Sequence, residues 1–431
     1  MNQTLPPGIA VANDRGVARR KDARVTMAAS SVGTARVAIV GGGIGGVAAA
    51  AFLQLAGLSA VVYEQATELR EVGAGLVLAP NAARLLRRLG VMDKLLGCAV
   101  PLDVGWEFRR WADGQVLSWE DLAGSCEQLY GERTYTVHRA DLLSAIAAVL
   151  PAGTVQLGRR CAGVLVHDDS AELGFTDGSS AEAEVVIGAD GVHSTVRGAV
   201  TDSSPPRYSG MCAFRAIVPA DRAPEFTRRR AQTLWIGPEH HLVHYPISGG
   251  AAVNLVAIAP AGDVTVESWS ATTTVEEFLA EFTGWDQRLQ DLIRQAGTPG
   301  RWALLDRDPL WRWSRGSVTL LGDAAHPMFP FFAQGAAQAI EDAVVLARCL
   351  AEDTTAPARA LRRYESLRIG RTTRLQEVSR VRAHVNHLPD GPEQEARDHS
   401  LAAADPLAAS AWIYAYDPDT AAAEGEHRHG R

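Results

Sequence analysis

Apolar positions near the start of the chain follow a strand–helix–strand pattern. Arg36–Val40 is a short apolar run that ends in glycines, which predicts a buried parallel strand. Ile44–Ala56 is rich in small residues and predicts a helix that Gly57 closes, and Ser59–Tyr63 predicts the next strand. Segments that alternate in this way are typical of an α/β fold with a parallel sheet.

The pattern of apolar positions changes between about residues 205 and 265. Four short strand-like runs, separated by proline and glycine, favour an antiparallel sheet over further strand–helix–strand units. These runs are Met211–Val218, Thr233–Ile236, His241–Ile247 and Ala252–Ala259. The first pattern then returns in a strand over Ser317–Leu321 and a helix over Gln334–Leu350. Because a long amphipathic helix from Ala358 to about His384 follows, the sequence predicts an α/β domain with an inserted antiparallel sheet and C-terminal helices.

These changes of pattern divide the chain into five parts. The first 35 residues carry a basic run and no apolar periodicity, and they are expected to be a disordered extension. The tail after Asp390 is polar except for Trp412–Tyr416, which is expected to dock on the body. The expected parts are the extension 1–35, the first part of the α/β domain 36–200, the sheet domain 201–300, the second part of the α/β domain 301–350, and the C-terminal helix and tail 351–431.

A glycine-rich loop joins the first predicted strand to the first helix. Gly41, Gly43 and Gly46 fit the pattern G-x-G-x-x-G. The first glycine permits the tight turn, the second lets the backbone approach a pyrophosphate, and the third allows close helix–strand packing. Glu64 ends the second strand, where an acid binds ribose hydroxyls and disfavours a 2′-phosphate. The loop therefore predicts FAD or NAD rather than NADP.

Two further glycine–acid turns follow strands. Asp190 follows the apolar run Glu184–Ile187, and by itself such an acid is most often part of a turn. Asp323 carries a stronger signal because it can bond ribityl or ribose hydroxyls. The helix that begins near Gly335 and Ala336 can then direct free backbone N–H groups at a flavin ring. A glycine loop paired with this distant turn indicates one FAD, held at its two ends by different parts of the chain.

The three sites, in this order, resemble those of the class A single-component flavoprotein monooxygenases with the p-hydroxybenzoate hydroxylase fold. The most similar branch contains the salicylate hydroxylases and 3-hydroxybenzoate 6-hydroxylases. The motifs that carry the resemblance are Glu71-Val72-Gly73-Ala74-Gly75, Pro80-Asn81-Ala82, His138-Arg139-Ala140-Asp141-Leu142, Gly322-Asp323-Ala324-Ala325-His326-Pro327-Met328, Ala333-Gln334-Gly335-Ala336 and Ile340-Glu341-Asp342-Ala343. The resemblance implies a Rossmann-like FAD-binding domain of the glutathione-reductase type, with an inserted antiparallel-sheet substrate domain and C-terminal helices.

The resemblance also implies the cofactors and the reaction. Since the chain has one G-x-G-x-x-G, NADH or NADPH would bind transiently and reduce the bound FAD. The reduced flavin would react with O₂ to form a C4a-hydroperoxide, which hydroxylates a small phenolic or hydroxybenzoate-like aromatic. The residues implied to hold FAD are Gly41, Gly43, Gly46, Glu64, Arg139, Asp323, Gly335 and Ala336, with Asp190 supporting the cofactor and the reductant.

Candidate substrate residues lie in the third strand-like run of the inserted sheet. Side chains alternate along a strand, so His241, Val243 and Tyr245 are expected on one face, and His240 and His244 on the other. This split, with no acid at suitable spacing, speaks against a metal site. The resemblance implies that His241 and Tyr245 line the substrate cavity, where a base would activate a phenol.

Other candidates lie near the flavin turn and on the first strand of the inserted sheet. Gln334 is a polar candidate beside the flavin, and Pro327 and Phe332 are expected to contribute apolar cavity wall. Arg215 is a candidate partner for a substrate carboxylate, although a structural ion pair explains it as well.

Composition limits the partners and the compartment. The net charge of −8 argues against nucleic acid or an anionic membrane as a partner, and no run is long and apolar enough to span a bilayer. Five scattered cysteines fit neither a disulfide framework nor a zinc site, so a reducing cytoplasm is expected. The protein is expected to be a monomer or a homodimer. Tailoring or epoxidation of a larger natural product, a flavin dehydrogenase or reductase, and a flavin protein without turnover remain open alternatives.

Overall fold

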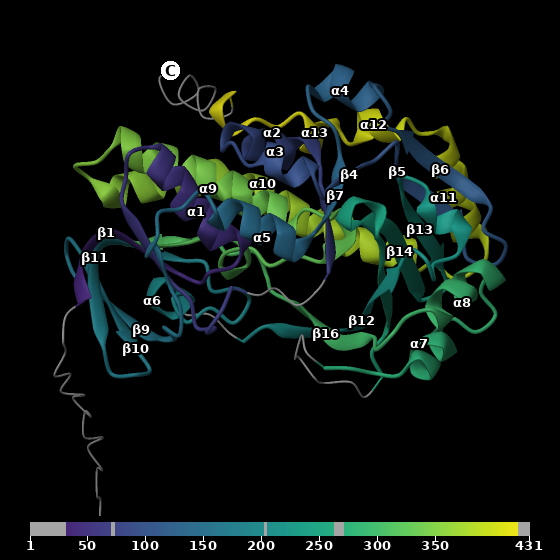
Figure 1. Ribbon diagram of the computed structural model, residues 1–431, viewed down its shortest axis with the longest axis horizontal. Coiled ribbons are helices and arrows are strands. Elements are labelled where there is room, and N and C mark those ends of the chain that lie inside the picture. Colours follow the sequence, from purple (N-terminus) through teal and green to yellow (C-terminus); the bar gives the residue numbers. More distant parts are fainter. Residues whose placement is uncertain (1–31, 70–73, 202–204, 263–270, 421–431) are drawn as a thin grey trace, which may run out of the picture.

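The computed structural model describes residues 32–69, 74–201, 205–262 and 271–420 (Figure 1). The expected N-terminal extension and the Glu71–Gly73 part of one motif fall largely outside these ranges. Among the helices within them, none combines the length and the apolar content that crossing a membrane requires.

A sheet of eight strands, counted over the described residues, forms one end of the molecule (Figure 1). Its strands are β1 (Val32–Val40), β2 (Ala60–Tyr63), β8 (Val155–Gln156), β9 (Cys161–Val166), β10 (Ala171–Phe175), β11 (Ser180–Gly188), β17 (Ser314–Arg315) and β18 (Val318–Leu320). The central strand β1 pairs in parallel with β2 and β11, and β18 pairs in parallel with β11. A strand from late in the chain therefore ends beside the glycine loop, which confirms the predicted α/β fold.

Helices α1 (Ile44–Leu55), α5 (Arg139–Ala147) and α9 (Gly335–Glu352) pack beside this sheet. The alanines of α1 are almost completely buried, and their small side chains let α9 approach closely. The predicted strand–helix–strand unit and the predicted helix over Gln334–Leu350 are confirmed. β1 begins four residues earlier than predicted, and the other ends differ by at most two residues.

A second sheet lies at the other end of the molecule and has seven strands within the described ranges (Figure 1). In spatial order they are β16 (Gly300–Asp306), β12 (Arg207–Pro219), β15 (Ala252–Pro260), β14 (His240–Ile247), β13 (Ala231–Gly237), β5 (Val104–Arg110) and β6 (Val116–Asp121). The four predicted runs form β12 to β15, and their antiparallel pairing is confirmed. Strands β5 and β6, and β16 except for its first residue, lie outside the interval 201–300 that the sequence assigned to the sheet.

One face of this second sheet is covered by α7 (Val275–Glu281) and α8 (Gln287–Arg294). Phe278 and Phe282 of this helical layer pack with Phe214, Trp235 and Leu242 of the sheet in one apolar cluster. Burial of such aromatic side chains supplies much of the stability of a layer. The opposite face of the sheet is turned toward the α/β domain.

The remaining elements connect the two ends. A small sheet contains β3 (Gly75–Leu78), β4 (Val100–Pro101) and β7 (Tyr135–His138), and the helix α2 (Pro80–Arg88) packs against β3. The other short helices are α3 (Met92–Leu96), α4 (Ser125–Tyr130) and α6 (Arg197–Val200), and α6 contacts β9, β17 and β18 of the first sheet. The long helix α10 (Pro357–Asn386) runs beside α9 toward the second sheet (Figure 1). The tail continues through α11 (Pro392–Ala403), α12 (Pro406–Ala409) and α13 (Ala411–Tyr414). Ile413 and Tyr414 are buried, which confirms the expected docking of the tail.

Candidate active site

A cavity of about 820 Å³ extends from the glycine loop to the inner face of the second sheet. Its lining includes Glu64 at one end and Tyr245 at the other, together with the first residues of α9. Cavities of this volume are typical of cofactor and small-molecule sites. The predicted nucleotide and substrate residues therefore border one continuous space.

The glycines of the loop have the geometry that a phosphate-binding turn requires. Gly41 has φ +108°, and a Cβ on it would lie 2.4 Å from the carbonyl oxygen of Ala189. A Cβ on Gly46 would lie 1.9 Å from the carbonyl oxygen of Gly41, so helix and strand are in close contact. By contrast, a Cβ on Gly43 would meet no described atom within 4 Å. This open space before the N-terminus of α1 fits a pyrophosphate.

Glu64 and Arg139 border the same end of the cavity. The Glu64 carboxylate accepts hydrogen bonds from the backbone N–H groups of Gly42, at 2.5 Å, and Ala66, at 2.8 Å. An acid in this place can exchange such backbone bonds for ribose hydroxyls. Arg139 is the first residue of α5, and its backbone N–H donates to the carbonyl of Ala74.

Glu64→Arg is expected to weaken FAD binding by about tenfold to a hundredfold, because a charge-assisted hydrogen bond contributes about 1.5–3 kcal/mol. Titration of apoprotein with FAD, followed by flavin fluorescence, measures this change. Glu68→Arg is the matched control, since Glu68 is exposed and does not line the cavity. Unchanged FAD affinity in Glu64→Arg would contradict the role of Glu64.

Asp190 also lines the cavity, but its carboxylate is engaged in its own turn. It accepts from Ser194 Oγ at 2.5 Å, Thr195 N at 2.7 Å and Val196 N at 3.1 Å. The carboxylate therefore fixes the course of the loop that follows β11.

The sequence analysis did not identify Arg197, which connects this loop to the turn that contains Asp323. Arg197 is fully buried, and its guanidinium donates to the carbonyl oxygens of Ala324 at 2.8 Å, Asp323 at 3.0 Å and Val192 at 2.8 Å. Burial and the nearby Arg307 lower the pKa of Arg197 to about 10, so it stays charged at neutral pH. No local pattern marks it, because its partners lie far along the chain.

Asp323 is exposed to the cavity, whereas its neighbours Gly322 and Ala324 are buried. The 3₁₀ turn Gly322–Ala324 begins one residue after β18 and places Asp323 at the cavity wall. Across the cavity, α9 begins at Gly335, and Gly335 and Ala336 line the wall. The positive end of this 18-residue helix therefore faces the cavity, where it can stabilise negative charge.

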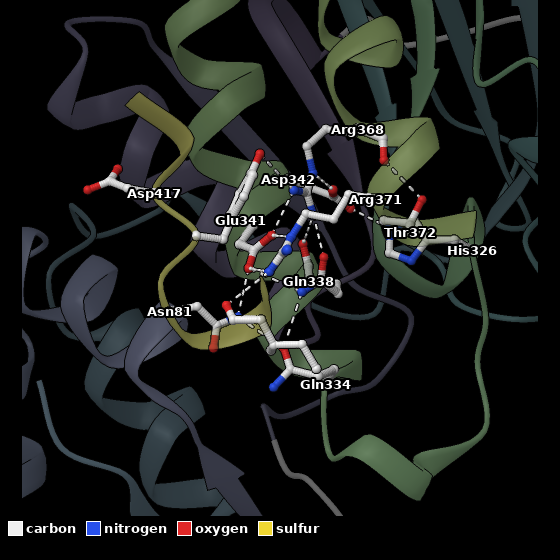
Figure 2. A network of polar contacts seen from close by, with 12 residues as sticks. Asn81, His326, Gln334, Gln338, Glu341, Asp342, Arg368, Arg371, Thr372 and Asp417 are labelled. Carbon is white, nitrogen blue, oxygen red and sulfur yellow. Dashed lines mark hydrogen bonds and ion pairs between the residues drawn. The ribbon is translucent and has the colours of Figure 1, made fainter. Parts of the chain in front are cut away.

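Gln334 was predicted to face the cavity, but its side chain does not line it. Its amide oxygen accepts from Asn81 Nδ2 at 2.9 Å and from Gln338 Nε2 at 3.2 Å, and the residue is 2% exposed. Figure 2 shows these side chains together behind the first turn of α9. Gln334 therefore supports the turn from behind, because buried partners from α2 and α9 capture its side chain.

The network in Figure 2 also holds the Gly322 turn. Asp342 accepts from Gly322 N at 3.0 Å, from Arg368 Nε at 2.6 Å, and contacts His326 Nε2 at 2.6 Å. Arg368 donates in turn to Glu341 at 2.7 Å. The turns at Gly322 and Gln334, which carry the predicted flavin contacts, are thus fixed by one buried network.

Asp342→Asn is expected to lower the free energy of unfolding by about 3 kcal/mol at pH 7, because it removes one of the two buried carboxylates that pair with Arg368. Burial alone would raise the pKa of Asp342, but His326 and Arg368 outweigh it and hold the pKa at about 2. This depressed pKa contributes stability above about pH 4, where the unfolded carboxyl ionises, and the contribution is lost as the pH falls toward 2.

Urea unfolding at several pH values measures this effect. The exposed Asp291, which is paired with Arg294, provides the control substitution Asp291→Asn, with an expected change of at most about 1 kcal/mol. Equal stability of Asp342→Asn and Asp291→Asn at pH 7 would contradict the structural role of the network.

On the substrate side, the predicted alternation along β14 is confirmed. His241, Val243 and Tyr245 line the cavity. On the other face, His240 Nε2 lies 3.1 Å from Glu281 Oε2, and His244 Nε2 accepts from Trp235 Nε1 at 3.2 Å. Within the described ranges, no three His, Cys, Asp or Glu side chains gather in a way that could hold a metal ion.

The cavity wall near Tyr245 depends on a close approach by β3. A Cβ on Gly75 would lie 2.7 Å from Tyr245 Cε2, and Gly75 N donates to Asn254 Oδ1 at 2.7 Å. Burial raises the pKa of Tyr245, so its hydroxyl stays protonated and can donate a hydrogen bond. The guanidinium of Arg215 lies 4.4 Å from the ring centre of Trp302, and both residues line the cavity.

Phe332 was predicted to line the cavity, but it does not. Successive side chains in the 3₁₀ turn Pro330–Phe332 point in directions about 120° apart, because the turn has about 3 residues per repeat. Phe332 therefore packs beneath Arg382, at 4.7 Å, whereas Phe331 faces the cavity and meets His241 edge-on at 5.1 Å. Pro327 lines the cavity as expected.

The sequence analysis missed several cavity residues. Trp106 and Trp302 come from strands that it did not predict, and Gln232 precedes the predicted run Thr233–Ile236 by one residue. Trp106 belongs to β5 and has φ +35°, which is unusual for a residue with a side chain. Gln232 and Trp302 come from β13 and β16. They add aromatic surface and one amide to the wall.

Comparison with known proteins supports the same assignment. The family model described as FAD binding domain matches residues 34–379. The chain is 43% identical over 382 residues to the 3-amino-4-hydroxybenzoate 2-monooxygenase of Streptomyces platensis, covering 89% of this chain and 96% of the relative. It is 37% identical over 384 residues to 3-hydroxybenzoate 6-hydroxylase 1 of Aquipseudomonas alcaligenes, covering 88% and 96%.

Among solved structures, a salicylate hydroxylase in complex with its substrate superposes with a TM-score of 0.76 at 26% identity, covering 90% of this chain and 97% of that chain. The fold and the paired flavin turns therefore define a class A FAD-dependent aromatic monooxygenase. The chain belongs to the FAD binding domain family, and the resemblance seen in the sequence is confirmed.

Proposed function

We propose that the protein hydroxylates a small benzoate that carries an amino or hydroxyl group, with 3-amino-4-hydroxybenzoate as the first candidate. FAD is the cofactor, and NADH or NADPH and O₂ are the co-substrates. The observation that carries the proposal is that Arg215, His241 and Tyr245 share one cavity with the FAD-binding loop. The names of the most similar relatives support this class of substrate.

Arg215 is proposed to bind the substrate carboxylate. A guanidinium offers two parallel N–H donors to a carboxylate, and its contact with Trp302 orients the planar group at the cavity wall. The apolar surfaces of Phe331 and Val243 would then contact the aromatic ring. These contacts favour a planar, acidic and single-ringed ligand.

His241 and Tyr245 are proposed to act on the polar ring substituent. Burial, followed by His387, His240 and Arg382, lowers the pKa of His241 well below its ordinary value, so the imidazole is neutral at pH 7. A neutral imidazole can accept the proton of a ring hydroxyl or a hydrogen bond from a ring amino group, and protonated Tyr245 can donate a hydrogen bond. Bound FAD would supply the electrophilic oxygen for the reaction.

The position of attack follows from the substituents of the candidate substrate. Carbon 2 of 3-amino-4-hydroxybenzoate is ortho to the amino group and meta to the hydroxyl group. The amino group therefore makes this carbon electron-rich, and a group that accepts a hydrogen bond from its N–H strengthens the effect. A neutral His241 fits this task, because an imidazolium could not accept the hydrogen bond.

The test is oxidation of NADH and NADPH by the purified yellow protein with a panel of benzoates, while O₂ and H₂O₂ are followed together. The panel contains 3-amino-4-hydroxybenzoate, 3-hydroxybenzoate, salicylate and benzoate. Stimulation with O₂ uptake, little peroxide and a hydroxylated product is expected for an aminohydroxybenzoate or hydroxybenzoate. Stimulation by no member of the panel would overturn the proposal and favour a larger natural product or a dehydrogenase.

We also propose that the protein acts in the cytoplasm as a monomer or homodimer. The five cysteines, all within the described ranges, are free, and four of them are buried. Free thiols fit a reducing compartment. Light scattering of the purified protein measures the oligomeric state.

A further inference from the structure

A second histidine contacts the histidine of the cavity. His387 follows the last residue of α10, and its Nε2 lies 2.6 Å from Nδ1 of His241, with ring centres 4.8 Å apart. The backbone carbonyl of His387 accepts from Glu239 N at 3.0 Å, in the hairpin turn between β13 and β14. The end of α10 is therefore fixed to the start of the strand that carries His241.

The two imidazoles lie at different depths. His241 is 4% exposed and borders the cavity, whereas His387 is only partly buried. His387 thus stands between the buried ring and solvent. No other described side chain hydrogen-bonds to His241.

This contact decides which nitrogen of His241 is free for the substrate. A neutral imidazole carries one proton, and the hydrogen bond of one nitrogen selects its position. If Nδ1–H of His241 donates to Nε2 of His387, the lone pair of His241 stays on Nε2. That nitrogen is the one left for the cavity, where it can accept a proton.

We propose that His387 is a positioning residue that selects this tautomer of His241 and conducts the substrate proton to solvent. The substrate hydroxyl proton passes to His241 Nε2, the Nδ1 proton of His241 passes to His387 Nε2, and the Nδ1 proton of His387 passes to water. One proton leaves the substrate and one enters water, and no electrons are exchanged with an external group. The inference rests on the proposed function, since it assigns the proton path of that reaction.

The groups around His241 and His387 disfavour a protonated state of either imidazole, so neither histidine keeps the proton. His387, His240 and Arg382 are the titratable or charged groups that face His241, and His240 and His384 are those that face His387. Burial, then His240 and His384, lowers the pKa of His387 to about 4. Both rings are therefore neutral at pH 7, and a proton that reaches them moves on.

The experiment compares His387→Leu with His387→Gln. Glutamine offers a carbonyl oxygen to His241 Nδ1–H but cannot pass a proton on, whereas leucine can do neither. His399→Gln is the matched control, because His399 is exposed on α11 and bonds only to a backbone carbonyl of its own helix.

The first readout is the ¹⁵N NMR spectrum of histidine-labelled FAD-loaded protein without reductant, with His241 assigned by its loss in His241→Gln. Wild type and His387→Gln are expected to show His241 protonated at Nδ1, and His387→Leu is expected to lose this single tautomer. Protonation of His241 at Nε2 in the wild type would overturn the proposal, whether or not the benzoates are substrates.

The second readout is the single-turnover rate with the benzoate that the panel identifies. His387→Leu is expected to slow hydroxylation by about tenfold to a hundredfold, at the lower end of the effect of losing a general base. Flavin reduction and substrate Kd should stay at wild-type values, and His387→Gln should show a larger solvent isotope effect than wild type. Wild-type hydroxylation rates in both variants would overturn the relay, while a wild type that hydroxylates no benzoate would instead overturn the proposed function.

Discussion

Replacement of Asp323 by alanine is expected to give a folded protein that purifies without its yellow FAD. The carboxylate is exposed to the cavity, and the turn around it is fixed by Arg197 on one side and by Asp342 on the other. A charged hydrogen bond contributes about 1.5–3 kcal/mol, so losing two such bonds to ribityl or ribose hydroxyls would weaken binding by roughly a hundredfold or more. The free energy of unfolding is expected to change much less than FAD binding, because the backbone contacts of the turn remain.

FAD occupancy after gel filtration, read from the absorbance ratio of flavin to protein, measures this loss. Asp323→Asn should retain part of the occupancy, since its amide can still bond hydroxyls. Asp169→Ala is the matched control, because Asp169 is exposed in the connection between β9 and β10 and does not line the cavity. Normal FAD occupancy in Asp323→Ala would refute the assignment of this turn to the cofactor.

His241→Ala is expected to slow hydroxylation by about a hundredfold to a thousandfold, the effect of losing a general base. The imidazole borders the substrate half of the cavity, and its pKa is lowered well below the ordinary value by burial, followed by His387, His240 and Arg382. Flavin reduction should remain close to the wild-type rate, because hydride transfer to FAD does not require the substrate to lose its hydroxyl proton.

Stopped-flow measurement of the reductive and oxidative half-reactions separates the two steps. His244→Gln provides a control on the same strand, since His244 faces away from the cavity and its acceptor role toward Trp235 is retained by glutamine. The thermal unfolding temperature of each variant shows whether loss of the contact between His241 and Phe331 has destabilised the protein around the cavity. Equal slowing of reduction and hydroxylation would remove His241 from the role of base.

The features that could be predicted from the sequence are those with a local physical cause. A phosphate turn needs glycine at fixed spacing, so the Gly41 loop and its helix were identified from adjacent residues. Alternation along a strand has a period of two, so the cavity face of β14, with His241 and Tyr245, was predicted correctly. The antiparallel sheet was visible for the same reason.

The features that could not be predicted depend on partners far away in the chain. The side chain of Gln334 turns from the cavity because Asn81 captures its oxygen, and their separation is 253 residues. Phe332 leaves the cavity because a short 3₁₀ turn, which has no clear sequence signature, rotates it toward Arg382. The pairing of His387 with His241 likewise depends on where α10 ends.

Strands β5 and β6 show the same limit at the level of a whole element. They contain charged residues such as Glu107 and Arg109, which pair with each other at 2.7 Å, so their pattern is not plainly apolar. Only the pairing of β5 with β13, from residues 231–237, brings both strands into the sheet, because β6 pairs with β5. The domain divisions expected from the order of the chain therefore did not include them.

The central claim is that the protein inserts one oxygen atom from O₂ into a benzoate ring at the cavity that holds His241 and Asp323. The most direct measurement is turnover with 3-amino-4-hydroxybenzoate and NADH or NADPH under isotopically labelled O₂, followed by mass spectrometry of the product. The account predicts a product heavier by one labelled oxygen atom, in amounts that match the nicotinamide oxidised. A product whose new oxygen comes from water, or oxidation of the substrate with no oxygen inserted, would contradict it.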